Sequence, residues 1–443
     1  MSADSQSSSR DAELDAIVIG GGPAGATAAT LLARHGRRVV VLEKDRFPRY
    51  RVGESLLPFC YGTLERLGLL KAMVRSPFTK KWSVQFVSTS GKLSTPFYFY
   101  KHMKHHSART WQVERSEFDQ LLLDTAREAG ATVHEETRVR ELITEGDKVV
   151  GVRAVGPDGE ALELRAPITI DASGRDAVAM KQYGWRMGDP VLNKVAIWTY
   201  YKGARRDDGL DSGATTVAYI PNKGWFWYIP LQDDRVSVGV VADKDTLYAE
   251  GRDPETIFHR EAAKNSWLAE HLAAGECEGN FRVTGDYSYR ARHCAADGLV
   301  LTGDALAFLD PVFSSGVFLA LKGGEMAADT VHAALSDGDV SAGRFAAYSA
   351  EILGHVEAMR KLVYAFYDEG FNFGEMLREY PHLRQDLTDC LIGNLERDFT
   401  ELWTAVAEFA SLPEEIPAGQ PLTSGLSGSS DPAAALAGDG AGA

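Results

Sequence analysis

The sequence predicts an α/β fold with a Rossmann-like domain, an inserted mixed β-sheet and a helical C-terminal region. A short apolar run at 15–20 predicts a buried strand, a helix is expected over 23–35, and a second strand over 38–43. This order is that of a βαβ unit, with a glycine-rich turn between the first strand and the helix. Residues 191–242 are rich in aromatic and β-branched side chains, which favours strands, whereas 340–412 has mostly helical spacing.

The nucleotide-binding domain is expected to be discontinuous, because buried strands and glycine signals recur far along the chain. A helix over 116–129 is expected to start with a cap formed by Ser116 and Asp119. The predicted division is a discontinuous nucleotide-binding domain (14–80, 113–185 and 285–335), a substrate-binding β-sheet domain (81–112 and 186–284), a C-terminal helical region (340–412), and a disordered tail rich in Gly, Ala, Ser and Pro (413–443).

Composition excludes several classes of protein. The 443 residues suffice for two or three structural units, and the net charge of −15 argues against a nucleic-acid partner. No apolar run approaches the ~18 residues of a membrane span, and the polar start of the chain predicts a cytoplasmic protein. The four cysteines lack CxxC spacing, so neither a zinc site nor a disulfide framework is expected, and no metal is assigned; they are Cys60, Cys277, Cys294 and Cys390.

The glycine-rich segment reads Gly-Gly-Gly-Pro-Ala-Gly and fits the G-x-G-x-x-G pattern. Gly20 permits the tight turn, Gly22 lets the backbone approach a pyrophosphate, and Gly25 lets the helix pack on the strand. Pro23 and Ala24 open the helix, whose free N–H groups and partial positive charge attract phosphate. These positions therefore predict a dinucleotide site.

An acidic residue completes this signal. Glu43 ends the second strand, where a carboxylate binds the ribose hydroxyls of a dinucleotide, and we include the adjacent Lys44 among the cofactor-binding residues. Such a carboxylate suits a ribose without a 2′-phosphate, but it does not separate FAD from NAD.

Three further segments resemble those of flavoprotein monooxygenases and their relatives. Residues 299–304 (Leu-Val-Leu-Thr-Gly-Asp) resemble the second FAD fingerprint, in which Asp304 binds the ribityl chain. Residues 171–175 (Asp-Ala-Ser-Gly-Arg) and 51–55 (Arg-Val-Gly-Glu-Ser) resemble two other signatures. The resemblance implies FAD, a glutathione-reductase-type domain, and cofactor contacts from Arg51 and Ser55. No second G-x-G-x-x-G has its own βαβ context, so a separate NAD(P)H-dependent flavin reductase is expected as partner.

Two segments and a lysine resemble the flavin-dependent halogenases. Residues 225–230 match W-x-W-x-I-P, and residues 308–316 match F-x-x-P-x-x-S-x-G. Lys81 precedes Phe86 at the spacing of the family's essential lysine. The residues that carry the second match are Phe308, Pro311, Ser314 and Gly316.

The resemblance implies a two-component enzyme in which reduced FAD, O2 and chloride or bromide form hypohalous acid. Lys81 would pass the active halogen to the substrate, and the backbone at Ser315 and Gly316 would bind halide. Trp225 and Trp227 would keep the substrate from the flavin. The halogenase motif also implies flavin-proximal positions at Phe308, Phe313 and Ser314, and cofactor contacts at Pro311, Gly316 and Val317.

One departure bears on the substrate. Tryptophan halogenases carry a Glu immediately before the serine of the motif, where this chain has Phe313. The segment resembles instead halogenases that act on phenols or pyrroles, free or tethered to a carrier protein. Three alternatives stay open at this point: an alkene reductase like geranylgeranyl reductase, an aromatic hydroxylase, and a non-enzymatic flavin-binding protein.

Overall fold

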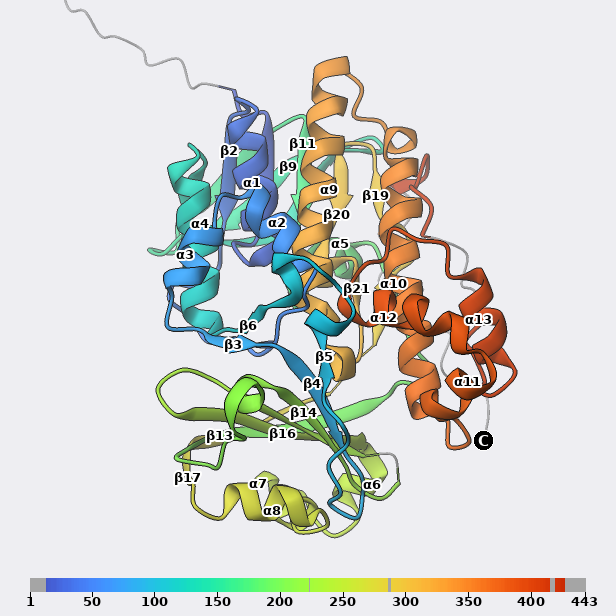
Figure 1. The fold of residues 1–443 in the computed structure, drawn as a ribbon. Coiled ribbons are helices and arrows are strands. Elements are labelled where there is room, and N and C mark those ends of the chain that lie inside the picture. Colours follow the sequence, from blue (N-terminus) through green and yellow to red (C-terminus); the bar gives the residue numbers. More distant parts are fainter. Residues whose placement is uncertain (1–12, 223, 286–287, 415–418, 427–443) are drawn as a thin grey trace, which may run out of the picture.

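The structure is a computed structural model that describes residues 13–222, 224–285, 288–414 and 419–426 (Figure 1). A six-stranded sheet with its covering helices forms one half of the molecule, and a seven-stranded sheet forms the other half. Helices of the C-terminal third lie along one side of both (Figure 1).

The six-stranded sheet has the order β19-β20-β11-β1-β2-β7 and is parallel except for β19. Its central strands β1, β2 and β11 have every residue buried, and β1 and β2 are wholly apolar, as expected for strands covered on both faces. The strands are β1 (Ala16–Ile19), β2 (Val39–Leu42), β7 (Thr132–His134), β11 (Ile168–Asp171), β19 (Ala295–Ala296) and β20 (Leu299–Leu301).

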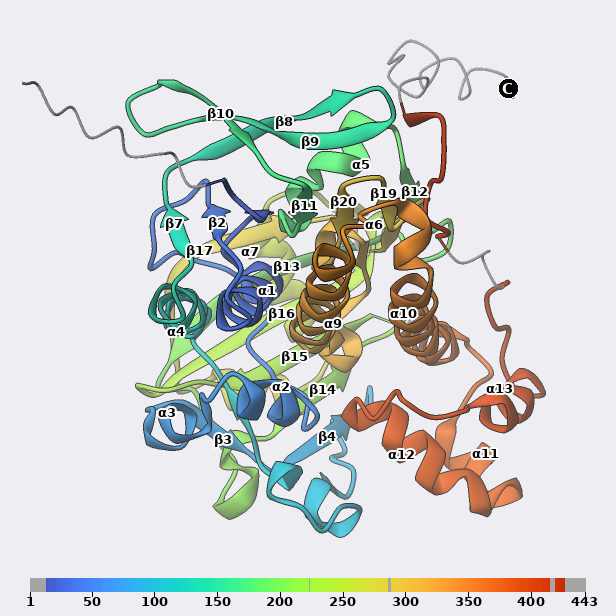
Figure 2. The same ribbon diagram turned by 90° about the horizontal axis from the view of Figure 1, so that it is seen from above.

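Helices cover one face of this sheet and a small antiparallel sheet covers the other (Figure 2). The helices are α1 (Pro23–Arg34), α4 (Arg115–Glu128) and α9 (Ser315–Asp337). The small sheet consists of β8 (Arg138–Glu145), β9 (Lys148–Val155) and β10 (Ala161–Arg165). Helices α1 and α9 pack against each other, so the nucleotide-binding half is built from segments that are far apart in the sequence.

The seven-stranded sheet has the order β17-β13-β16-β15-β14-β4-β5, and only the β14–β4 pair is parallel. One face looks toward the six-stranded half, and short helices cover the other (Figure 1). The strands are β4 (Ser83–Val87), β5 (Phe97–Tyr98), β13 (Lys194–Lys202), β14 (Thr215–Tyr219), β15 (Trp225–Pro230), β16 (Arg235–Asp243) and β17 (Glu276–Thr284). The helices are α6 (Lys244–Tyr248), α7 (Pro254–Ala262) and α8 (Ser266–Leu272).

Smaller elements connect the halves. The strands β3 (Thr79–Lys81) and β6 (Thr110–Gln112) form a two-stranded ladder, and β12 (Arg186–Gly188), β18 (Tyr289–Ala291) and β21 (Ala307–Phe308) form a three-stranded one. The remaining helices are α2 (Cys60–Arg66), α3 (Leu70–Arg75), α5 (Val178–Gln182), α10 (Ala346–Tyr367), α11 (Phe373–Glu379), α12 (Arg384–Ile392) and α13 (Thr400–Ala407).

Two sequence predictions need correction. Helix α4 begins at Arg115, its N-cap residue Glu114 makes no capping hydrogen bond, and the carboxylate of Asp119 binds arginines instead. Most of the predicted disordered tail lies outside the described residues. The described part 419–426 is packed rather than disordered, because the Leu422 N–H donates to a backbone carbonyl and Leu426 is buried. Within the described ranges, no helix has the length and apolar character that crossing a membrane requires.

Candidate functional site

A cavity of about 770 Å³ lies where the glycine turn, the start of α9 and the strand β15 meet. Segments that are far apart in the sequence share its wall. Of the residues predicted for the site, those in the wall are Gly20, Gly22, Pro23, Ala24, Glu43, Lys44, Arg51, Ser55, Trp225, Trp227, Asp304, Phe308, Pro311, Ser314, Gly316 and Val317. Gly25, Lys81, Phe313 and Ser315 lie outside it.

The glycine turn has the geometry that its sequence predicts. Gly20 has φ of 99°, and a Cβ there would lie 2.5 Å from the Ala172 carbonyl oxygen. A Cβ on Gly25 would lie 1.9 Å from the Gly20 carbonyl oxygen, so helix α1 approaches β1 only because this residue is glycine. A Cβ on Gly22 would meet only an Arg49 side-chain nitrogen, at 3.4 Å. Gly22 is the N-cap residue of α1, and no side chain forms a capping hydrogen bond there. The first N–H groups of the helix are therefore available to a phosphate.

The two acidic residues predicted to hold the cofactor differ in their surroundings. Glu43 is buried, and its carboxylate accepts the N–H groups of Gly21 at 2.7 Å and Asp45 at 2.9 Å. Burial raises the pKa of Asp304 to about 6, although Arg115 and Arg175 lower it. Both carboxylates suit a ligand that donates hydroxyl protons. With the open helix start, these residues fit FAD.

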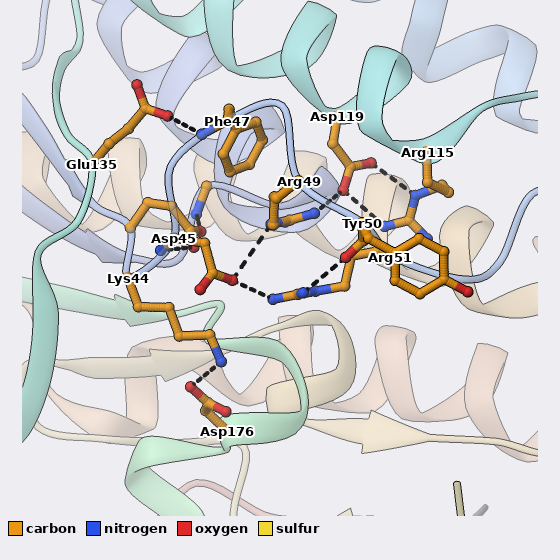
Figure 3. A network of polar contacts seen from close by, with 12 residues as sticks. Lys44, Asp45, Phe47, Arg49, Tyr50, Arg51, Arg115, Asp119, Glu135 and Asp176 are labelled. Carbon is orange, nitrogen blue, oxygen red and sulfur yellow. Dashed lines mark hydrogen bonds and ion pairs between the residues drawn. The ribbon is translucent and has the colours of Figure 1, made fainter. Parts of the chain in front are cut away.

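Ion pairs surround this end of the cavity (Figure 3). Lys44 contacts Asp176 at 2.6 Å, and Arg51 contacts Asp45 at 2.7 Å. Both predicted cofactor-binding cations are thus paired with a carboxylate while they line the wall. These pairs fix the orientation of the side chains around the glycine turn.

A buried ion-pair cluster supports the same loop. Arg49 contacts the Asp119 carboxylate at 2.7 Å, and Arg115 contacts it at 2.8 Å (Figure 3). Arg115 also donates to the carbonyl oxygens of Val52 and Gly53 at 2.8 and 3.3 Å. Helix α4 therefore holds the Arg51–Ser55 segment in place against the cavity.

Lys81 is one of the most deeply buried polar residues, with 1% of its surface exposed. Its Nζ donates to the Ser55 Oγ at 2.8 Å and to the Leu56 carbonyl oxygen at 3.2 Å. Burial lowers the pKa of Lys81 to about 7. Lys80, its neighbour on β3, is exposed. The amine thus sits directly behind Ser55, which lines the cavity.

The start of α9 forms a tight turn at the cavity wall. Asp310 is fully buried and accepts the Val312 N–H at 3.1 Å. Ser314 adopts φ of 56°, in the left-handed region that non-glycine residues seldom occupy. It holds the N-cap position of α9 but makes no side-chain capping hydrogen bond. The helix begins at Ser315, as predicted, and Gly316 lies exposed in its first turn.

Aromatic side chains close the wall beside this turn. The rings of Trp225 and Trp227 lie 6.2 Å apart, and both indoles are buried. Phe308 lies under the Arg175 guanidinium at 5.3 Å. Phe313 packs edge-on against Phe366 at 5.8 Å, behind the wall.

Two polar connections were not identified from the sequence. Trp225 Nε1 donates to the Tyr367 hydroxyl at 2.8 Å, which donates to the Asp310 Oδ2 at 2.9 Å. Glu54 lines the cavity and accepts from the Tyr200 hydroxyl at 2.6 Å. The only sequence signal for Glu54 is its place inside the Arg-Val-Gly-Glu-Ser segment.

Comparison with known proteins identifies the family. Residues 13–362 match the model of an FAD binding domain. A 1H-pyrrole-2-carbonyl-[peptidyl-carrier protein] brominase of Pseudoalteromonas luteoviolacea is 32% identical over 90% of this chain and 96% of that protein. A tryptophan 2-halogenase of Chondromyces crocatus is 35% identical over 80% of this chain and 67% of that protein.

Solved structures agree with this result. The flavin-dependent brominase Bmp2 superposes with a TM-score of 0.81 at 30% identity, over 90% of this chain and 97% of that one. The predicted fold class and the FAD cofactor are confirmed. The chain belongs to the flavin-dependent halogenases.

Proposed function

We propose that this halogenase forms hypohalous acid from reduced FAD, O2 and chloride or bromide, and that Lys81 passes the active halogen to an electron-rich aromatic substrate. The observation that carries the proposal is the burial of the Lys81 amine against Ser55, a residue that lines the cofactor cavity. FAD supplies the electrons that reduce O2. The protein holds the reactants and keeps water from them.

The state of the Lys81 amine supports this role. With a pKa of about 7, a large fraction of the amine is neutral at neutral pH, unlike an exposed lysine. A buried amine can donate hydrogen bonds to a small oxidant or act as its nucleophilic acceptor. Ser55 orients the nitrogen, because its Oγ accepts from Lys81 and contacts the Thr215 hydroxyl at 2.8 Å.

For the halide we propose the turn at Ser315 and Gly316. This turn is the N-terminus of the 23-residue helix α9, whose N–H groups carry partial positive charge. Gly316 lines the cavity, and it has no side chain that would obstruct a halide. Trp225 and Trp227 line the same cavity, where we propose that they exclude the organic substrate and so suppress hydroxylation.

The substrate class that we propose is a pyrrole or phenol, free or tethered to a carrier protein. A relative of nearly the same length is named for a carrier-bound pyrrole. Another relative is named for tryptophan, but this chain has Phe313 where tryptophan halogenases carry a glutamate base. A separate NAD(P)H-dependent flavin reductase is the proposed partner.

The test is an aerobic assay with reduced FAD, bromide and a panel of pyrroles and phenols, each free and carrier-bound. Isotope-pattern mass spectrometry detects brominated product. Lys81→Met should abolish product and leave FAD binding nearly unchanged, whereas Lys80→Met, on the exposed side of the same strand, should keep both. Product from Lys81→Met at the parent's rate would remove this lysine from the mechanism.

A further inference from the structure

A row of hydrogen-bonded side chains leads from the cavity to the surface. Glu54, 1% exposed, lines the cavity and accepts from the Tyr200 hydroxyl at 2.6 Å. The Tyr200 hydroxyl lies 3.2 Å from that of Tyr50. Tyr50 is 36% exposed and belongs to the wall of an open hollow on the surface. Three groups that exchange protons thus connect the cavity with the protein surface.

The Glu54 carboxyl group is buried and only partly hydrogen-bonded, which is unusual for an acidic side chain. Only its Oε1 has a hydrogen-bond partner among the described residues, while Oε2 is buried without one. Burial raises the pKa of Glu54 to about 7, against the lowering effects of Tyr200, Ser237 and Arg115, and Glu114 raises it further. A large fraction of the group therefore carries a proton at neutral pH.

Cations line the outer part of the row. The Arg282 guanidinium lies 4.1 Å from the Tyr50 ring and 6.0 Å from the Tyr200 ring, and that of Arg235 lies 4.6 Å from Tyr200. The Trp198 indole N–H donates to the Tyr50 hydroxyl at 2.6 Å, which fixes that hydroxyl toward Tyr200. Burial raises the pKa of Tyr200 well above that of a free phenol, so a proton must pass in a concerted shift and not through a lasting phenolate.

The proposed chemistry needs such a route. Reduced FAD, O2, one halide ion and one proton give FAD, hypohalous acid and one water. The hypohalous acid and the aromatic C–H then give the carbon–halogen bond and a second water, with no net proton exchanged. Each turnover therefore takes up one proton, and the exclusion of water that the proposed function requires would leave the protein to supply it.

We infer that Glu54 supplies this proton and that Tyr200 and Tyr50 return one to it from solvent. The O–H bond of Glu54 breaks, and the proton goes to the oxygen that leaves as water. Tyr200 then gives its proton to Oε1 while it takes one from Tyr50, which takes one from water. Both oxygen pairs lie within hydrogen-bond distance in the structure. Because Tyr200 has one proton and donates it to Oε1, the Tyr50 hydroxyl must turn its own proton toward Tyr200, and rotation of the Glu54 carboxyl group resets the row for the next turnover. The inference rests on the proposed function.

The test compares Glu54→Gln, Tyr200→Phe and Tyr50→Phe with the parent enzyme. Bromination rates are measured with reduced FAD from pH 6 to 9, in H2O and in D2O, together with FAD affinity and thermal stability. Tyr201→Phe is the matched control, because its side chain is on the opposite face of β13 and stacks on Phe258.

Glu54→Gln should lower kcat about 100-fold or more, as for loss of a general acid. Each tyrosine variant should lower it at least about tenfold. FAD affinity should persist in all. The parent should lose activity as pH rises through about 7, with a solvent isotope effect, and Glu54→Gln should lack this loss of activity. Tyr201→Phe should match the parent.

Three results decide the matter. Parent-like rates in Glu54→Gln and in both relay variants would overturn the inference alone. A Glu54-dependent limb that rises with pH would also overturn it, since Glu54 would then act as a base toward the substrate. A parent that brominates no substrate would contradict the proposed function, and with it this inference.

Discussion

The Nζ of Lys81 donates a hydrogen bond to the Oγ of Ser55 at 2.8 Å. This contact joins the ladder of β3 and β6 to the segment that lines the cofactor cavity, and both side chains are buried. Because Ser55 lies between the amine and the cavity, the hydroxyl decides how the amine is oriented. The pair therefore offers a direct way to change the proposed catalytic group without removing it.

Ser55→Ala should move the pH dependence of halogenation. Loss of the hydroxyl removes an acceptor of the ammonium form, so the pKa of Lys81, already near 7, should fall further. We expect the limb of the rate profile due to Lys81 to shift to lower pH by about one unit. Halogenation rates are measured from pH 5 to 9 in the parent, in Ser55→Ala and in Lys81→Met. The limb due to Lys81 is the one that moves in Ser55→Ala and is absent from Lys81→Met. A limb at the parent's pH would mean that Ser55 does not control the amine.

Lys81→Met should change how stability depends on pH. In the folded protein the pKa of Lys81 is lowered to about 7 from the usual 10.5, so the unfolded chain binds more protons between these values. The parent therefore gains stability as pH rises through this window, and a methionine does not. From pH 7 to 9 the parent should gain about 2 kcal/mol relative to the variant.

Urea unfolding at both pH values measures this difference. Lys80→Met is the control, because Lys80 is exposed on the same strand. Its stability should run parallel to that of the parent. A difference between parent and Lys81→Met that stays constant with pH would show that the amine titrates as an exposed lysine does.

Local patterns explain how much of this site the sequence could predict. The glycines at positions 20 and 25 could be predicted to form a tight turn, because a Cβ at either position would clash with the backbone. The buried strand before the turn could be predicted from its apolar run. The contact between Glu54 and Tyr200 joins residues 146 positions apart. It depends on how the seven-stranded sheet packs against the nucleotide-binding half, which no local pattern encodes.

Asp119 shows the same limit. Its sequence position beside Ser116 favours a helix cap, but tertiary contacts with Arg49 and Arg115 determine where its carboxylate points. A buried carboxylate must be paired, and the two arginines satisfy this requirement better than backbone N–H groups would. Pairing between distant segments overrides the local preference.

Gly25→Ala should abolish FAD binding and destabilise the fold. The added Cβ would lie 1.9 Å from the Gly20 carbonyl oxygen, so helix α1 would have to move away from β1 and withdraw its N–H groups from the cavity. We expect a stability loss of about 1–3 kcal/mol, as for other overpacked sites. Gly62→Ala is the control, because nothing lies near its Cβ position in helix α2. Flavin fluorescence titration distinguishes the two; equal affinities would contradict the role given to Gly25.

Tyr367→Phe should loosen the turn before α9. The variant leaves the buried Trp225 N–H without its acceptor, and it removes the donor to the Asp310 Oδ2 while the Val312 N–H still binds Oδ1. The expected stability loss is about 1–3 kcal/mol, and the KM for halide should rise because Asp310 fixes the proposed halide turn. Tyr364→Phe, which loses only a hydroxyl that donates to Asp189, is the control. An unchanged KM for halide in Tyr367→Phe would show that the hydrogen bonds among Trp225, Tyr367 and Asp310 do not affect halide binding.

Phe313→Glu should not convert the enzyme to a tryptophan halogenase. The Phe313 ring packs against Phe366 behind the cavity wall, so a glutamate there would bury a charge without a partner. We expect a stability loss of about 3 kcal/mol or more, because the substitution loses aromatic packing and buries a carboxylate. To relieve this cost the carboxyl group would have to take up a proton, and a protonated acid cannot serve as a base for indole. Mass spectrometry of tryptophan incubated with parent and variant tests this. Halotryptophan from the parent would overturn the proposed substrate class, and halotryptophan from the variant alone would show that position 313 is sufficient to set it.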